Sequence, residues 1–137
     1  MNEVFTKTNV LYNEFSLAIF VSKGLGIKSP KIISYNESTE LLVMEKKLFS
    51  NVADLYGEED NLTPEFIFKK IRKIIKKLYD SGIIYPDITG YNFLIDNNKE
   101  IWIIDFGNAY VKSPDDPDNQ FVLDFINGKN TWNPEYK

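Results

Sequence analysis

The sequence predicts a single α+β domain, and the arrangement of apolar residues supports this. Residues 63–81 alternate apolar and basic residues with the period of a long amphipathic helix. Residues 31–35 with 40–46, and 92–96 with 100–105, are β-rich runs that flank short polar turns, which is typical of hairpins. The chain has 137 residues and is 43% hydrophobic, so we expect residues 1–137 to share one core.

The first half of the chain predicts a helix followed by a hairpin. The short run at 4–7 is β-like, and residues 10–23 are expected to form a helix that ends at Gly24 and Gly26. Its apolar face comprises Leu11, Phe15, Ala18, Ile19 and Phe20.

The second half predicts a short helix at 52–56 and then the long helix. We expect Thr63 to cap its N-terminus, Pro64 to be its first residue, and Gly82 to end it. A loop at 83–91, the second hairpin and a helix near 119–127 follow. The apolar face of the long helix comprises Ile67, Phe68, Ile71, Ile74, Ile75, Leu78 and Tyr79. The opposite, basic face comprises Lys69, Lys70, Arg72, Lys73, Lys76 and Lys77.

The composition excludes several kinds of chemistry. The chain has neither histidine nor cysteine, so a general base must be a carboxylate, a lysine or a tyrosine. The net charge is −4, and we interpret the basic helix face as solvated, so we expect no nucleic-acid partner. No apolar run approaches the roughly 18 residues of a membrane span and none resembles a signal peptide, so we expect a cytoplasmic protein without membrane contact.

Three polar residues stand at a spacing that indicates chemistry. Asp87 lies five residues before Asn92, and Asn92 lies thirteen residues before Asp105, which opens the run Asp105-Phe106-Gly107. Alone, Asp87 would be a turn residue and Asn92 the start of a strand. Together they resemble the catalytic loop and the D-F-G motif of protein kinases.

This resemblance implies a role for each residue. Asp87 would accept the proton of the substrate hydroxyl, while Asn92 and Asp105 would hold Mg²⁺ on the phosphates of ATP. Oxygen ligands of this kind suit magnesium. We also expect Gly107 to allow a sharp turn after the metal ligand.

The order of elements extends the resemblance over roughly residues 7–110. Residues 42–45 are similar to the last strand of the kinase N-lobe, running into the hinge. The resemblance implies that Met44 is the gatekeeper and that the backbone of Glu45 and Lys47 meets the adenine. A core strand with a charged end is the alternative.

The catalytic loop departs from most protein kinases. Tyr85-Pro86 replaces the usual His-Arg before the aspartate, and Thr89 replaces a lysine. The run from Asp87 to Asn92 is more similar to RIO kinases and to the small kinase of the tRNA threonylcarbamoylation complex. It is more distantly similar to aminoglycoside phosphotransferases.

The front of the kinase fold is short. Glu14 is the candidate for the helix glutamate, and the residues before it cannot hold two strands and a Gly-rich loop. Lys7 either pairs with Glu14 and neutralises phosphate charge, or is an exposed lysine near the terminus. We therefore expect a protein-kinase-like fold with a truncated N-lobe and hinge at 1–47, lacking the Gly-rich loop, and a reduced C-lobe at 48–137.

Two functions follow from the resemblance. The first is an atypical minimal serine/threonine protein kinase that uses ATP and Mg²⁺ on a protein substrate. The second is a pseudokinase that docks on a host kinase or scaffold partner without catalysis. A small-molecule phosphotransferase is a third hypothesis, which the absence of substrate-lobe insertions disfavours. The Lys, Asn and Ile-rich composition hints at an AT-rich genome, as in some large viruses, and hence at the cytoplasm of a host.

Overall fold

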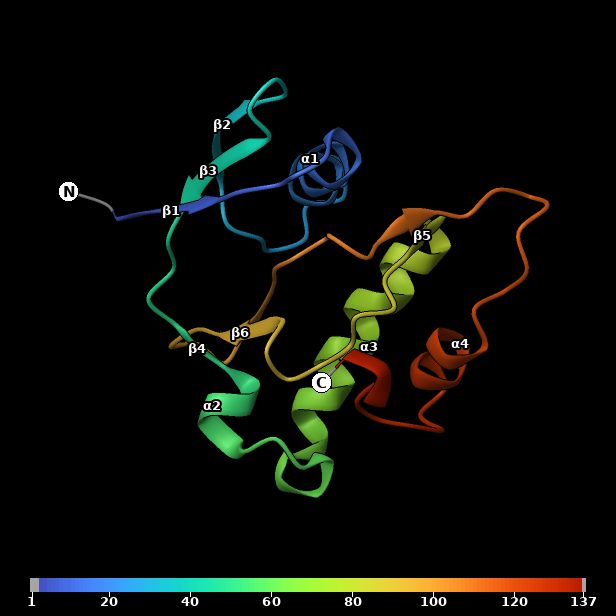
Figure 1. Cartoon of the computed structure of the whole chain (residues 1–137). Helices are drawn as coiled ribbons and strands as arrows, with labels where there is room; N and C mark the ends of the chain where they lie inside the picture. The colour runs from blue at the N-terminus through green and yellow to red at the C-terminus, as the bar shows by residue number, and fades with distance from the viewer. Residues whose placement is uncertain (1–2, 137) are drawn as a thin grey trace.

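The computed structural model describes residues 3–136, and its N-terminal part is a small sheet with one helix beside it (Figure 1). The three strands are antiparallel in the order β1-β3-β2, so the central strand β3 pairs with both neighbours. The elements are β1 (Val4–Lys7), α1 (Tyr12–Ile19), β2 (Ile32–Asn36) and β3 (Leu41–Glu45). The predicted hairpin and the β-like run at 4–7 are therefore confirmed.

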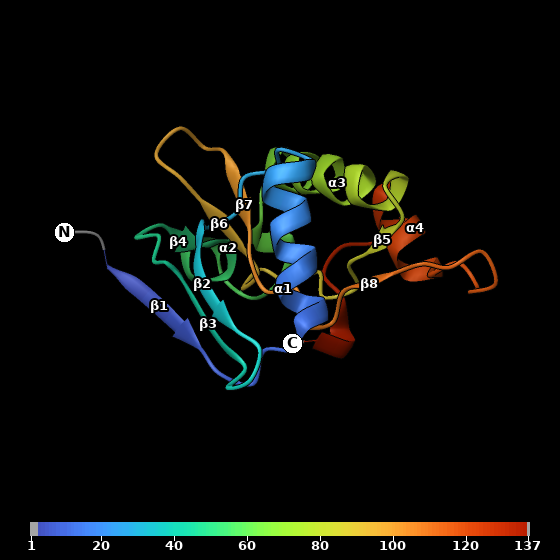
Figure 2. The same cartoon turned by 90° about the horizontal axis from the view of Figure 1, so that it is seen from above.

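Helix α1 is fixed to this sheet by an aromatic contact and a hydrogen bond. The rings of Phe15 and Tyr35 stack with their centroids 4.4 Å apart, and the Tyr35 hydroxyl donates to the Val10 carbonyl at 2.7 Å. Offset-stacked aromatic pairs of this kind add stability beyond the apolar area that they bury. Seen from above in Figure 2, α1 consequently lies alongside β2.

The apolar face predicted for the first helix is partly wrong. Leu11 lies before α1 and its side chain is 63% exposed, while Phe20 is 45% exposed. The α-helix passes into a single π-helical segment, η1 (Phe20–Gly24), whose wider turn shifts the side chains around the axis. The predicted Ala18 is buried, and the other buried residues are Leu17 and Val21, which were not predicted.

The C-terminal part is built around one long helix (Figure 1). Two small sheets, β4-β6-β7 and β5-β8, accompany it. The elements are β4 (Ser50–Asn51), α2 (Val52–Tyr56), η2 (Asp60–Leu62), α3 (Glu65–Asp80), β5 (Ile83–Ile84), β6 (Phe93–Ile95), β7 (Ile101–Ile103), β8 (Tyr110–Val111), α4 (Gln120–Ile126) and η3 (Pro134–Tyr136). Strands β4, β5 and β8 have two residues each, too few for a periodic pattern to predict them.

Helix α3 buries its predicted apolar face. Five of its side chains are at most 2% exposed: Ile67, Phe68, Ile71, Ile75 and Leu78. The expected capping is wrong, because Pro64 occupies the N-cap position and Thr63 lies before it. The buried Thr63 hydroxyl has no hydrogen-bond partner among the described residues.

The basic face of α3 is not solvated throughout. The Arg72 side chain is only 13% exposed, and its Nε donates to the Phe125 carbonyl at 2.9 Å while Nη2 donates to the Asn130 carbonyl at 3.1 Å. Lysine cannot form this fork. Arg72 therefore ties the last turn of α4 to α3, whereas Lys73 beside it is exposed.

The two parts of the molecule are joined through the segment after η1. The Ile103 amide donates to the Lys28 carbonyl at 3.0 Å, and the Ser29 hydroxyl donates to the Ile103 carbonyl at 2.9 Å. These bonds attach residues 28–29 to β7 and so fix the N-terminal sheet above the C-terminal sheets. Among the helices described, none is long and apolar enough to cross a membrane.

Candidate functional site

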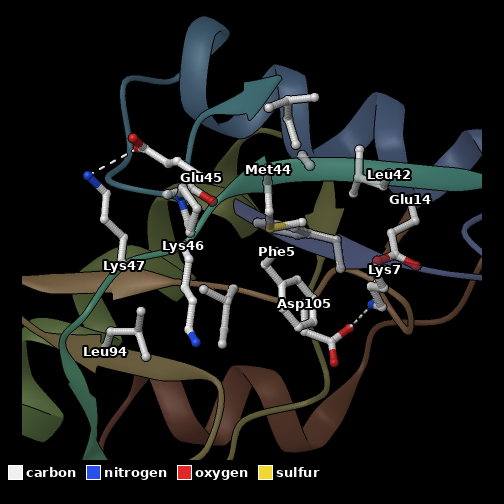
Figure 3. A pocket seen from close by; sticks show the side chains of 16 residues that line it. Phe5, Lys7, Glu14, Leu42, Met44, Glu45, Lys46, Lys47, Leu94 and Asp105 are labelled. Atoms are coloured by element: carbon white, nitrogen blue, oxygen red, sulfur yellow. Dashed lines mark hydrogen bonds and ion pairs between the residues drawn. The ribbon is translucent and has the colours of Figure 1, made fainter. Parts of the chain in front are cut away.

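A cavity of about 280 Å³ lies between the two parts of the molecule. Phe5, Leu42 and Met44 line its wall on the N-terminal sheet, and Leu94 and Ile104 line the facing wall (Figure 3). Apolar walls with a few polar groups at one end are typical of small-molecule sites. The predicted gatekeeper Met44 thus faces this cavity.

At one end of the cavity, three charged residues from separate segments meet (Figure 3). Lys7 at the end of β1 places its Nζ 2.6 Å from Glu14 Oε2 on α1 and 3.1 Å from Asp105 Oδ1. Of the two alternatives for Lys7, the structure therefore has the one in which it pairs with Glu14. Burial alone would lower the pKa of Lys7, but the two carboxylates outweigh it and raise that pKa above its ordinary value.

The turn after Asp105 is not made by glycine flexibility, so the expected role of Gly107 is wrong. Asp105 itself has a φ of 65°, in the left-handed region, whereas Gly107 has no positive φ. Aspartate tolerates this region when its short side chain bonds locally, and the Gly107 amide donates to Asp105 Oδ1 at 3.1 Å. A Cβ on Gly107 would lie 3.2 Å from Asp105 Oδ1 and 3.4 Å from Glu14 Oε1, so a larger residue here would crowd both carboxylates.

Asp87 lies in the loop between β5 and β6 and is 8% exposed. Its Oδ2 accepts a hydrogen bond from Asn108 Nδ2 at 3.1 Å, and its carbonyl accepts one from Asn92 Nδ2 at 2.9 Å. Burial raises the pKa of the Asp87 carboxyl, and the bond from Asn108 offsets this only in part. The charge of Asp105 further raises the pKa of the Asp87 carboxyl, whereas the charge of Lys7 lowers it.

Tyr85 occupies the position where most protein kinases have the histidine of the catalytic loop. It is 1% exposed, its hydroxyl donates to the Ile104 carbonyl at 2.6 Å, and its ring contacts the edge of Phe106 with centroids 5.6 Å apart. Burial raises the pKa of this phenol well above its ordinary value, so it stays protonated and acts as a donor. Tyr85 therefore joins the catalytic loop to the segment that presents Asp105.

The predicted hinge has its polar backbone groups at the far end of the cavity. The Glu45 amide donates to the Lys31 carbonyl at 2.9 Å, so the carbonyl of Glu45 is the group of that residue left for an adenine. The Lys47 amide donates no hydrogen bond within residues 3–136. Its side chain is held aside, with Nζ 3.1 Å from Glu45 Oε1 and 4.6 Å from the centroid of the Trp102 ring.

The residues present fit a magnesium ion that also binds phosphate oxygens. Asn92 uses its amide nitrogen in the bond to Asp87, so its oxygen is the atom that remains for a metal. Asp105 adds a carboxylate that is 41% exposed. The described residues contain no cluster of three His, Cys, Asp or Glu side chains, so any further ligands would come from phosphate oxygens and water.

Sequence reasoning missed two polar residues at this site. Asn108 follows Asp105-Phe106-Gly107 directly, and this position could have identified it as a candidate site residue. Asn133 lies in the C-terminal segment and hydrogen-bonds the backbone on both sides of Asp87. No local pattern predicts that contact, because Asn133 lies 46 residues after Asp87 in the sequence.

Comparison with known proteins gives a consistent family. A model of the RIO domain matches residues 9–127. The chain is 30% identical over 110 residues to 3-deoxy-D-manno-octulosonic acid kinase of Vibrio cholerae, covering 76% of this chain and 46% of the relative. It is 31% identical over 94 residues to the EKC/KEOPS complex subunit BUD32 of Encephalitozoon cuniculi, covering 69% of this chain and 45% of the relative.

Solved structures agree on the fold. The kinase PK-1 of the Cydia pomonella granulovirus has a TM-score of 0.59 at 20% identity and covers 80% of this chain and 44% of its own. WbdD has a TM-score of 0.60 at 26% identity, and the match covers 85% of this chain and 27% of WbdD. The chain spans less than half the length of these relatives. It belongs to the RIO domain family, as an atypical member of the protein-kinase-like superfamily with a truncated fold.

Proposed function

We propose that this chain binds Mg-ATP in the cavity between its two parts and transfers the γ-phosphoryl group to a hydroxyl. The observation that carries this proposal is the cluster of Lys7, Glu14 and Asp105, which three separate segments bring to one end of an apolar cavity. A cluster that served stability alone would not need a partly exposed carboxylate in a left-handed conformation beside an open cavity.

Each charged residue has a task in this reaction. Lys7, oriented by Glu14, neutralises phosphate charge, and Asp105 with Asn92 would hold the magnesium ion that supplies further neutralisation. The acceptor oxygen gives its proton to the Asp87 carboxylate and forms a bond to the γ-phosphorus. The bond from that phosphorus to the bridging oxygen breaks, and ADP leaves with the electron pair.

The raised pKa of Asp87 suits this task. Partial burial makes the carboxylate a stronger base than a solvated aspartate, while the bond from Asn108 keeps one of its oxygens in place. The other oxygen can then face the acceptor hydroxyl. Apolar cavity walls exclude water from the nucleotide and so reduce the loss of phosphate to hydrolysis.

For the acceptor, we propose a serine or threonine hydroxyl of a protein, as in the protein kinases that the catalytic loop resembles. The kinship with a 3-deoxy-D-manno-octulosonic acid kinase supports a second candidate, the hydroxyl of a sugar acid. Both acceptors are alcohols, so the same base and metal ligands serve either one. Which of the two acceptors is phosphorylated therefore depends on which molecule binds beside Asp87.

A docking function without catalysis is the competing proposal. In the part of the chain that the structure describes, no strand pairs with the outer edge of β1 and no glycine-rich turn covers the cavity. A nucleotide bound to these residues alone would lack a lid over its phosphates. In that case the chain would bind a host kinase or scaffold partner through its surface.

A transfer assay separates these proposals. The chain is incubated with Mg²⁺ and ATP labelled at the γ-phosphate, and with one of three acceptors: itself alone, dephosphorylated casein, or 3-deoxy-D-manno-octulosonic acid. We expect label on at least one acceptor and none when EDTA removes the metal. Label on the sugar acid alone would reject the protein acceptor.

Nucleotide binding gives the second measurement. A thermal melt with Mg-ATP should raise the melting temperature of the wild type, and Asp105→Asn should reduce that shift. A shift without any transfer would favour the docking proposal. The absence of both transfer and magnesium-dependent binding would reject a phosphotransferase.

A further inference from the structure

The C-terminal segment after α4 contacts the catalytic loop directly (Figure 1). Asn133 is 4% exposed and makes a pair of bonds that bracket Asp87. Its side-chain Nδ2 donates to the carbonyl of Pro86 at 2.9 Å, and its backbone amide donates to the carbonyl of Ile88 at 2.8 Å. The residues on either side of the proposed base are thus held by one asparagine.

The side chain of Asn133 is itself fixed. Its Oδ1 accepts a hydrogen bond from the Glu135 amide at 3.1 Å, so the amide group is held at both ends. The two bonds together fix the orientation of the amide group. Its oxygen accepts from the Glu135 amide, and only its nitrogen can donate to the Pro86 carbonyl. A buried, doubly bonded side chain of this kind positions its partners with little freedom.

The catalytic loop needs such support because it has little regular structure. Within the loop, the Ile88 amide donates to the Pro86 carbonyl and the Thr89 amide to the Asp87 carbonyl, which are tight local turns. Neither bond attaches the loop to the rest of the molecule. Asn92 holds the Asp87 carbonyl and Asn133 holds the two neighbouring carbonyls, so the backbone around Asp87 is fixed from two sides.

We propose that Asn133 is a positioning residue, and that the C-terminal segment acts as a clamp that aims Asp87 at the acceptor. This inference rests on the proposed phosphotransfer, in which Asp87 touches the acceptor hydroxyl. Asn133 does not touch the reacting atoms and acts through the loop. Loosening it misplaces the base while the Lys7, Glu14 and Asp105 cluster at the nucleotide keeps its geometry.

The test uses Asn133→Asp, which keeps the Oδ1 acceptor and the backbone amide but replaces the Nδ2 donor with an oxygen. We expect kcat to fall by about 10- to 100-fold, as for a base displaced by a fraction of an ångström. The KM for ATP and the Mg-ATP melt shift should stay within about twofold of the wild type, because the nucleotide site does not involve Asn133. Asn133→Ala, which adds no charge, should give the same split.

Asn127→Asp is the matched control. Asn127 is exposed at the C-cap of α4, six residues before Asn133. We expect its kcat to stay within about twofold of the wild type. Equal losses of kcat in the Asn127 and Asn133 variants, or a rise in the KM for ATP that accounts for the loss, would overturn the proposal.

Hydrogen exchange tests the clamp independently of any activity. In the wild type the Asn133 amide should be protected together with amides of residues 87–92, and Asn133→Asp should raise exchange in 87–92 without changing α3. An unprotected Asn133 amide in the wild type would overturn the clamp even if neither variant folds. If the wild type transfers no phosphate, the proposed function fails, and exchange still decides whether the clamp exists.

Discussion

Replacing Lys7 with methionine removes the cation that holds two carboxylates together. Lys7 Nζ lies 2.6 Å from Glu14 Oε2, and the two side chains are 30% and 12% exposed, so this bond is charge-assisted and partly desolvated. A hydrogen bond to a charged group contributes about 1.5–3 kcal/mol. The contact with Asp105, whose side chain is 41% exposed, adds about 0–1 kcal/mol.

We therefore expect Lys7→Met to lower the free energy of unfolding by about 2–3 kcal/mol, measured by urea denaturation. The same variant should lose the melt shift with Mg-ATP. Lys69→Met is the control, because Lys69 is exposed on α3, and its free energy of unfolding should change by less than about 0.5 kcal/mol.

A double-mutant cycle isolates the interaction between Lys7 and Glu14. Glu14→Gln and the double variant complete the cycle, and we expect a coupling free energy of about 1–2 kcal/mol between Lys7 and Glu14. A coupling below about 0.5 kcal/mol is what independent sites give. That result would mean that Lys7 is an exposed lysine with no structural partner.

Two further substitutions test how the site is supported. Tyr85→Phe leaves the partly buried Ile104 carbonyl without its donor, so we expect a loss of about 1–2 kcal/mol in urea denaturation; an unchanged midpoint would contradict that bond. Arg72→Met removes the donor to the Phe125 carbonyl and should cost about 1–3 kcal/mol, whereas Lys73→Met should change stability by less than about 0.5 kcal/mol. Equal effects of the two α3 substitutions would mean that Arg72 does not fix α4.

The parts of the fold with long periodic patterns could be predicted from the sequence. Helix α3 buries the expected face because its apolar residues recur over four turns, and the first hairpin lies where alternation and a polar turn placed it. The beginning of α3 was misplaced, since the choice between Thr63 and Pro64 as cap depends on a hydrogen bond that the Thr63 hydroxyl does not make.

At the site, the pairing of Lys7 with Glu14, one of two alternatives that the sequence left open, follows from the order of elements. Lys7 ends a strand and Glu14 lies on the helix that follows, so packing that helix on the sheet brings the two together. Asp105 joins them because it follows β7. The roles of these residues in nucleotide binding stay predictions until Mg-ATP is tested.

Other features depend on contacts between distant segments and could not be predicted. Asn133 reaches the catalytic loop only because α4 turns the chain back toward it, and α4 is itself fixed by Arg72. The left-handed backbone of Asp105 also has no signature in the sequence, which instead suggested that Gly107 makes the turn.

The most direct test of the central claim is the rate of phosphate transfer by Asp87→Asn. Asparagine has nearly the shape of aspartate but cannot accept the acceptor proton, so transfer should fall by about 10²- to 10⁴-fold. Asp80→Asn, at the exposed end of α3, should leave the rate unchanged. Binding of Mg-ATP should be retained by both variants, because Asp87 does not line the cavity proposed to hold the nucleotide. Transfer by Asp87→Asn at the wild-type rate would contradict the assignment of Asp87 as the base.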